Sequence, residues 1–189
     1  MQGCIALIGA GGAAAYSALE DRRTAGMQIE DEGIEVRATN RIEERVRERA
    51  HVNVTAFNRS VLVTGEAWDE ATREEIGKIV AAVPNVKSVT NEVQVAPLSS
   101  LAARAGDSSL TAKVRARFLN VKDFNPVHIK VVTEGGVVYL LGIVTEKEAN
   151  AATEIARTTA GVRKVVRVFD YCTSADEACR PAPAAKSAR

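Results

Sequence analysis

The sequence predicts an α+β protein made of two tandem copies of one helix–strand–strand–helix–strand unit. Two short apolar runs, at residues 60–66 and 137–143, both carry a glycine near their end, and these glycines, Gly65 and Gly142, lie 77 positions apart. Each run is followed by a charged stretch of helical composition and then by an apolar strand pattern, which indicates a duplicated unit. We therefore expect two αββαβ domains, each with a small three-stranded mixed sheet packed against two helices.

An amphipathic helix is expected to open each copy. In the first copy an apolar residue recurs every fourth position from Ile34 to Val46, and in the second the same spacing runs from Leu110 to Phe118. The polar residues at 107–108 are good N-caps for the second of these helices, because Asp and Ser side chains accept hydrogen bonds from the backbone N–H groups of a first turn.

A β-hairpin is expected after each of these helices. Residues 53–57 alternate polar and apolar side chains, as a half-buried strand does, and residues 127–132 are their counterpart. The connection to the glycine-containing run is two residues long in the first copy, Asn58-Arg59, and three residues long in the second, 134–136.

A second helix and a closing strand are expected to complete each copy. The helices begin near Asp69 and Thr145, and the chain turns after them at 84–85 and 160–161. Trp68, at the start of the first of these helices, is expected to cover the sheet edge or the domain interface, with partner binding as the alternative. The apolar residues of the closing strands are Val86, Val89, Val93 and Val95 in the first copy and Val162, Val165, Val166, Val168 and Phe169 in the second.

The repeat divides the chain into five parts. These are an N-terminal segment at 1–29, a first domain at 30–96, a linker at 97–106, a second domain at 107–171 and a polar tail, expected to be disordered, at 172–189. Because a domain of about 65–70 residues buries little surface, we expect each copy to be only modestly stable.

The N-terminal segment has three interpretations. Residues 1–4, Met-Gln-Gly-Cys, resemble the end of a lipobox, so Cys4 is the expected lipidation site and the Gly/Ala-rich stretch after it a tether. A dinucleotide-binding turn is the second interpretation, because Gly9, Gly11 and Ala14 form a GxGxxA pattern, but the residues that follow do not fit the strand that such a fold needs. A flexible tail is the third.

Charge is distributed unevenly between the two copies. The net charge of the whole chain is +1, which gives no signature of nucleic-acid binding. Residues 30–96 hold 9 basic and 13 acidic side chains, whereas residues 107–171 hold 10 basic and 7 acidic. Basic residues are concentrated at the first helix of the second copy, where Lys113 and Arg117 lie one turn apart. This pattern favours attraction of the second domain to an anionic surface.

Three segments resemble the BON domain of bacterial envelope and osmotic-stress proteins, namely 21–31, 110–115 and 140–149. Together with Cys4 and the two copies in order, they make the sequence similar to the dual-BON-domain outer-membrane lipoproteins, the DolP-like family, over nearly the whole chain. The resemblance implies a protein that is lipid-anchored at the periplasmic face of the outer membrane. It also implies that the second BON domain contacts anionic phospholipid and that the protein supports envelope integrity.

The expected phospholipid-binding residues lie in or just after the first helix of the second domain. Relatives can carry an aromatic residue near the start of this helix, whereas this chain reads Ser108-Ser109-Leu110, so contact would shift to Phe118 and Phe124. The apolar residues of this set would equally serve as core residues. The alternative function is a protein-interaction module of envelope assembly or stress machinery, with outer-membrane assembly proteins as partners and no direct lipid binding. The expected lipid-binding residues are Leu110, Lys113, Val114, Arg117, Phe118 and Phe124.

Catalysis is not expected, and neither are a metal, a cofactor or nucleic acid. The sequence has no nucleophile elbow and no evident Ser/His/Asp set. His51 and His128 are far apart and have no obvious acidic or cysteine partner, so we interpret both as structural. Cys172 and Cys179 are expected to form a disulfide in an oxidising periplasm, with free thiols or a metal pair as the alternatives.

Overall fold

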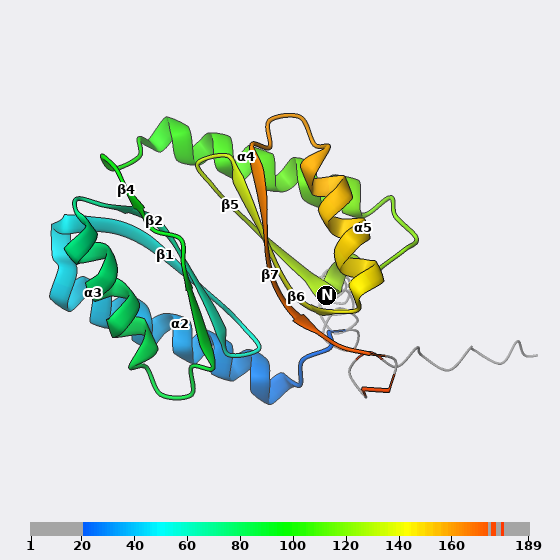
Figure 1. Cartoon of the computed structure of the whole chain (residues 1–189), viewed down its shortest axis with the longest axis horizontal. Helices are drawn as coiled ribbons and strands as arrows, with labels where there is room; N and C mark the ends of the chain where they lie inside the picture. The colour runs from blue at the N-terminus through cyan, green and yellow to red at the C-terminus, as the bar shows by residue number, and fades with distance from the viewer. Residues whose placement is uncertain (1–20, 174, 177–178, 180–189) are drawn as a thin grey trace, which may run out of the picture.

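The computed structural model describes residues 21–173, 175–176 and 179, and it contains two units of the same topology (Figure 1). In each unit an antiparallel hairpin is extended by a parallel third strand, and two helices cover one face of the sheet. This confirms the predicted α+β fold with two tandem αββαβ units. The first unit contains α2 (Ala25–Val46), η1 (Arg47–Arg49), β1 (Ala50–Phe57), β2 (Ser60–Ala67), α3 (Glu70–Ala81), β3 (Ser88–Asn91) and β4 (Gln94–Val95). The second contains α4 (Leu101–Phe118), η2 (Pro126–His128), β5 (Ile129–Glu134), β6 (Val137–Val144), α5 (Glu146–Arg157) and β7 (Lys164–Tyr171).

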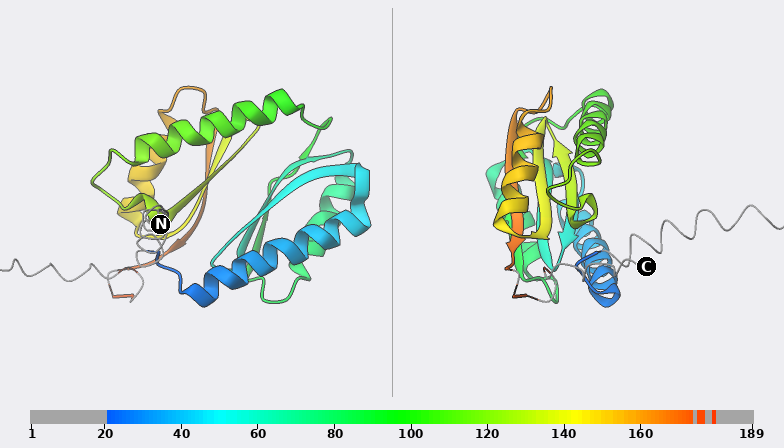
Figure 2. Two further views of the ribbon diagram at one scale, coloured as in Figure 1. Left: turned by 180° about the vertical axis from the view of Figure 1, so that it is seen from behind. Right: turned by 90° about the vertical axis from the view of Figure 1, so that its right-hand side faces the viewer.

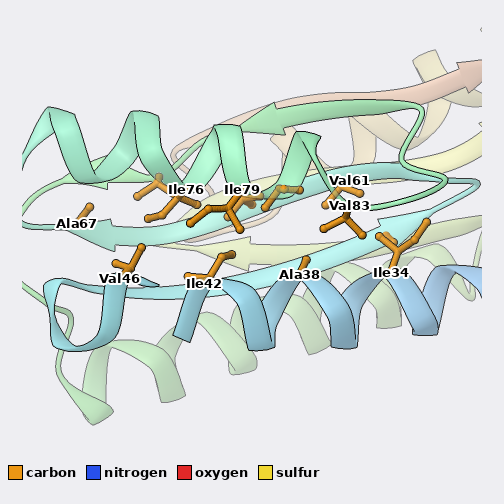
Figure 3. Close-up of a cluster of buried hydrophobic side chains, with 13 residues drawn as sticks. Ile34, Ala38, Ile42, Val46, Val61, Ala67, Ile76, Ile79 and Val83 are labelled. Atoms are coloured by element: carbon orange, nitrogen blue, oxygen red, sulfur yellow. The ribbon is translucent and has the colours of Figure 1, made fainter. Parts of the chain in front are cut away.

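Helix α2 begins before the predicted domain boundary at residue 30. The side chain of Thr24 caps this helix by accepting a hydrogen bond from the backbone N–H of Met27. The apolar residues that recur from Ile34 to Val46 are buried, and they point across the core toward the side chains of α3 (Figure 3). Residues 21–29, which the sequence assigned to the tether, therefore belong to the folded first unit.

Helix α4 likewise begins earlier than predicted. Ser100 caps it by accepting a hydrogen bond from the backbone N–H of Ala103, so residues 101–106 of the expected linker are helical. Asp107, one of the two expected N-caps, lies inside the helix instead. The connection between the units is therefore short.

The two hairpins are held by matching carboxylates. Asp31 of α2 accepts hydrogen bonds from both backbone N–H groups of the Asn58-Arg59 turn, at 2.8 and 2.7 Å. Asp107 of α4 accepts from both N–H groups of Gly135-Gly136, each at 2.8 Å. All four turn residues have positive φ, as a two-residue hairpin turn requires. The second turn is one residue shorter than predicted, because Glu134 belongs to β5.

Two of the predicted strands differ from those observed. The closing strand of the first unit is interrupted, so that β3 and β4 pair with successive parts of β2 and Val93 lies buried between them. In the second unit the expected strand at 127–132 begins only at Ile129. Pro126 to His128 form a 3-10 turn, which the side chain of Asn125 caps.

The sheets of the two units pack face to face, and their helices lie on the outside (Figure 2). Phe57 and Leu62 of the first sheet form a common buried cluster with Tyr139 and Leu141 of the second. Since successive strand residues point to opposite faces, β2 presents Val61 to its own helices and Leu62 to the other sheet. Every residue of β2 is therefore buried, and the two units form one packed body.

Candidate functional site

The four apolar residues that the sequence assigned to phospholipid contact are buried in the second unit. Leu110, Val114 and Phe118 lie on the face of α4 that packs against the sheet. The ring of Phe124 meets that of Phe118 edge to face, with ring centroids 5.0 Å apart. A bilayer cannot reach these side chains while the unit is folded, and this corrects their assignment: they are core residues.

The basic residues near α4 differ in what they contact. Arg117 donates a 2.8 Å hydrogen bond to the backbone carbonyl of Ile155 and others to two hydroxyls at the end of α5, so it ties the two helices together. Arg115 donates to a backbone carbonyl of β5. Lys113 and Lys122 are exposed and make no hydrogen bond or ion pair to the described part of the chain. Of the predicted cations, Lys113 is thus available to a ligand, whereas Arg117 already holds structural partners.

Helix α4 also has an uncharged side that faces solvent, which we call the α4 outward face. Five residues make up this face, and they are spaced four, seven, four and three positions apart. In a helix of 3.6 residues per turn, this spacing places all five on the same side. The leucines at its two ends are among the most exposed large apolar residues of the described chain, Leu101 at 81% and Leu119 at 75%. The sequence prediction missed both, because it placed Leu101 in the linker and followed only the inner stripe. The α4 outward face consists of Leu101, Ala105, Ala112, Ala116 and Leu119.

The segment 21–31, which carries part of the family resemblance, connects the two units. Arg23 forms an ion pair with Asp31 at 2.9 Å and thereby stays within the first unit. Its neighbour Arg22 donates to both carboxylate oxygens of Glu148 in α5, at 2.8 and 2.9 Å. Two consecutive arginines therefore bind one unit each, and their role is structural.

A partly buried carboxylate lies between the units. Glu134 accepts hydrogen bonds from Asn53 at 3.0 Å and from Thr64 at 3.3 Å, both from the first unit. Burial raises the pKa of Glu134 above its ordinary value despite these bonds. It lines a cavity of about 340 Å³ together with residues of both units. Among the described residues, no three His, Cys, Asp or Glu side chains are grouped so as to hold a metal ion.

Trp68 and His128 have surroundings that the sequence did not predict. Trp68 is 61% exposed in the bend between β2 and α3, so most of its side chain faces solvent and is not used to cover the sheet edge or the domain interface. His51 lies in β1. His128 has an acidic neighbour that the sequence did not reveal, since its Nδ1 lies 4.0 Å from Oε1 of Glu148.

One of the three cysteines lies near the N-terminus of the sequence and two lie near its C-terminus. Cys4 lies outside the described residues. Cys172 and Cys179 are joined by a disulfide, with their Cα atoms 6.1 Å apart, and Cys179 is buried. The backbone N–H of Cys172 donates to the carbonyl of Val144, so the start of the predicted tail continues the second unit. Within the described chain, no helix combines the length and the apolar character that crossing a bilayer requires.

Comparison with known proteins identifies the repeated unit. The BON domain family matches residues 30–97 and 106–173, which are the two αββαβ units. The chain is 36% identical to the outer membrane lipoprotein DolP of Haemophilus influenzae over 173 residues, 90% of either chain. It is 31% identical to a 21 kDa hemolysin of Actinobacillus pleuropneumoniae, covering 80% of this chain and 79% of the hemolysin. It is also 31% identical to the osmotically-inducible protein Y of Escherichia coli, over 60% and 58% of the two chains. The chain therefore belongs to the BON domain family and, within it, to the two-domain outer-membrane lipoproteins.

Proposed function

We propose that this protein binds anionic phospholipid at the periplasmic face of the outer membrane through the α4 outward face, and that this contact supports envelope integrity. The observation that carries the proposal is the exposure of Leu101 and Leu119 at the two ends of one uncharged helix side. A continuous exposed apolar surface on a folded protein marks an interaction site. Here Ala105, Ala112 and Ala116 lie between the two leucines on one side of the helix. A helix that lies in a membrane interface buries such a side and keeps its cations at the head groups.

Two lysines beside this surface supply the electrostatic part of the contact. A basic residue near an anionic membrane contributes about 1 kcal/mol, so Lys113 and Lys122 together contribute about 2 kcal/mol. A contact of this size is weak and reversible by itself. A lipid anchor at Cys4 would make it sufficient, because a tether raises the effective concentration of the protein at the surface. The stretch from Cys4 to Asp21 can extend to at most about 60 Å, which leaves room for α4 to reach the bilayer.

The alternative is a protein-interaction module of the envelope that uses the same surface for a protein partner. The two functions differ in what the surface binds, and neither requires catalysis. The names of the three relatives described above denote a lipoprotein, a hemolysin and an osmotically induced protein. We therefore propose a binding role without enzymatic activity.

Sedimentation with lipid vesicles tests the proposal. The protein is expected to sediment with phosphatidylglycerol vesicles more strongly than with phosphatidylcholine vesicles, and added salt should weaken this binding. The double variant Lys113→Glu/Lys122→Glu is expected to bind phosphatidylglycerol at least about thirtyfold more weakly, because it removes the attraction of both lysines and adds repulsion. Arg117 is left unchanged, because its loss would disturb the packing of α4 on α5.

A matched double variant on the first unit serves as the control. Arg73→Glu/Lys78→Glu makes the same change in net charge on α3, where both side chains form exposed intrahelical pairs. It is expected to keep nearly all of the affinity. Absence of binding to phosphatidylglycerol, or an equal loss in both double variants, would refute the proposal, and capture of a protein partner without vesicle binding would favour the alternative.

A further inference from the structure

A second exposed apolar surface lies where β2 ends and the connection to the second unit begins. We call it the Trp68 patch, and it consists of Trp68, Val95, Leu98 and Leu101, all of which are exposed. β4 and the start of α4, to which Val95 and Leu101 belong, lie at one end of the molecule (Figure 1). No other tryptophan occurs in the 189-residue sequence.

Hydrogen bonds fix the backbone on which this patch is built. Ala67, the residue before Trp68, pairs with Val95 in the β2–β4 ladder, and its carbonyl accepts a 3.1 Å hydrogen bond from the N–H of Ala96. The N–H of Ser99 donates to the carboxylate of Glu66 at 3.1 Å. The connection between the units is thus held against the end of β2. Leu98 precedes Ser99 in this connection, and Leu101 follows two residues after it.

Trp68 itself sits on an ordered backbone. Its N–H donates a 3.0 Å hydrogen bond to the carbonyl of Arg49, and the next residue, Asp69, caps α3. An aromatic side chain of this size usually dominates a core or an interface, because it buries 150–250 Å². Here the fold holds the backbone in place and leaves the residue 61% exposed. An unburied indole at a fixed position is suited to a partner outside the chain.

Leu101 belongs both to the Trp68 patch and to the α4 outward face, so the two surfaces are continuous. The acidic residues that follow Trp68 already have partners. The carboxylate of Asp69 accepts a 2.7 Å hydrogen bond from the N–H of Thr72, and Glu70 pairs with Arg73 at 3.2 Å. Tryptophan prefers the boundary between head groups and acyl chains, because its ring is apolar and its N–H is polar.

We propose that Trp68 inserts into the same bilayer that the α4 outward face contacts, so that the first unit adds an aromatic residue to the membrane contact. This inference rests on the proposed phospholipid binding. It adds a membrane contact from the first BON domain, whose net charge is unfavourable for an anionic surface and whose contribution is therefore apolar. The contribution of Trp68 to affinity is then independent of salt, whereas that of Lys113 and Lys122 falls as salt rises.

Tryptophan fluorescence of the full-length protein tests the inference directly, because all of the signal comes from Trp68. On addition of phosphatidylglycerol vesicles the emission is expected to shift to shorter wavelength, and lipids brominated on the acyl chain are expected to quench it. The variant Trp68→Ala is expected to lower vesicle affinity at least about fivefold, by the same factor at low and at high salt. The control is Tyr171→Ala, which removes an exposed aromatic at the end of β7 and is expected to leave the affinity unchanged.

The outcomes separate this inference from the proposed function. Sedimentation with vesicles that leaves the Trp68 emission unshifted and unquenched would overturn the inference while the lipid-binding function stands. No sedimentation with anionic vesicles would overturn both. A shift that persists in the Lys113→Glu/Lys122→Glu variant with unchanged affinity would support Trp68 insertion and overturn the role of α4.

Discussion

Replacing Arg22 by Ala is expected to destabilise the whole protein, because this side chain joins the two units. Its guanidinium forms two hydrogen bonds to Glu148 and a third, at 2.8 Å, to the carbonyl of Ile143. The charged side chains are only 11% and 12% exposed. Breaking a buried ion pair costs about 3–5 kcal/mol. Glu148 keeps its hydrogen bonds from Thr145, so we expect a smaller loss of about 2–3 kcal/mol in the free energy of unfolding.

Thermal unfolding followed by circular dichroism measures this loss. For a protein of this size, 1 kcal/mol shifts Tm by about 2–4 °C, so Arg22→Ala is expected to lower Tm by about 5–10 °C. Arg157→Ala is the matched control, because it removes an arginine from an exposed pair within α5 and is expected to shift Tm by less than about 2 °C. Equal Tm shifts in the two variants would refute the conclusion that Arg22 stabilises the contact between the two units.

The same pair makes the stability depend on pH. Burial alone would raise the pKa of Glu148, but hydrogen bonds from Arg22 and Thr145 outweigh burial and hold it below its ordinary value. Its stabilising contribution is therefore fully present above the pKa of the unfolded chain and is lost as pH falls through the lower pKa of the folded state. The difference in stability between the wild type and Arg22→Ala should accordingly shrink in acid. A difference that stays constant or grows at low pH would contradict this assignment.

Three further substitutions test the core and the turns. Phe118→Ala is expected to lower the free energy of unfolding, measured in urea, by about 3–5 kcal/mol and to leave the vesicle affinity of the folded protein unchanged. A loss of affinity without a loss of stability would show instead that Phe118 contacts lipid. Gly142→Ala places a Cβ against the carbonyl oxygen of His128, so little folded protein is expected by circular dichroism, and a fully stable variant would contradict the strand packing. Asp107→Ala removes two hydrogen bonds to the second hairpin turn and is expected to cost about 1–3 kcal/mol, whereas no change would show that the turn does not depend on it.

The signals that predicted the fold have local physical causes. The glycines that revealed the repeat, Gly65 and Gly142, are needed because a Cβ at either position would collide with a backbone carbonyl oxygen. This is the oxygen of His51 in β1 for Gly65 and that of His128, just before β5, for Gly142. The apolar residue at every fourth position from Ile34 to Val46 predicted the inner face of α2, because this face packs against the core of the first unit. Each of these features depends only on contacts within one unit, so its pattern can be recognised in a single sequence.

The packing of the two units depends on partners that the sequence does not specify. In the sequence, Leu62 and Tyr139 resemble ordinary strand residues. Their burial results from packing of each residue's sheet against the sheet of the other unit. An apolar residue at every position of a short strand does indicate burial of both faces. That signal was present in residues 137–143, but it does not say what covers the second face. The partner of Arg22 lies 126 positions away, and no local pattern points to it.

The candidate surface was predicted on the right helix but on the wrong side. Periodic apolar residues such as Val114 satisfy the core and the lipid interpretation equally well, and only the position of the sheet decides between them. Leu101 was missed because Asp107 or Ser108, after a glycine, was expected to cap the helix. Ser100 supplies an earlier cap, seven residues before Asp107.

Besides the Trp68 patch, packing leaves the outer sides of the helices for a partner, and these sides are not equivalent. Both sheets are covered, on one face by helices and on the other by the opposite unit. The outer sides of α2, α3 and α5 carry charged residues, for example Glu43, Glu74 and Glu154. Among the described helices, α4 alone has an outer side without charge that ends in an exposed leucine at each end. The exposed apolar residues of α2, Ile29 and Val36, occupy only part of their helix side, which also carries Glu43. A membrane that contacts this protein along a whole helix therefore buries the least charge at α4.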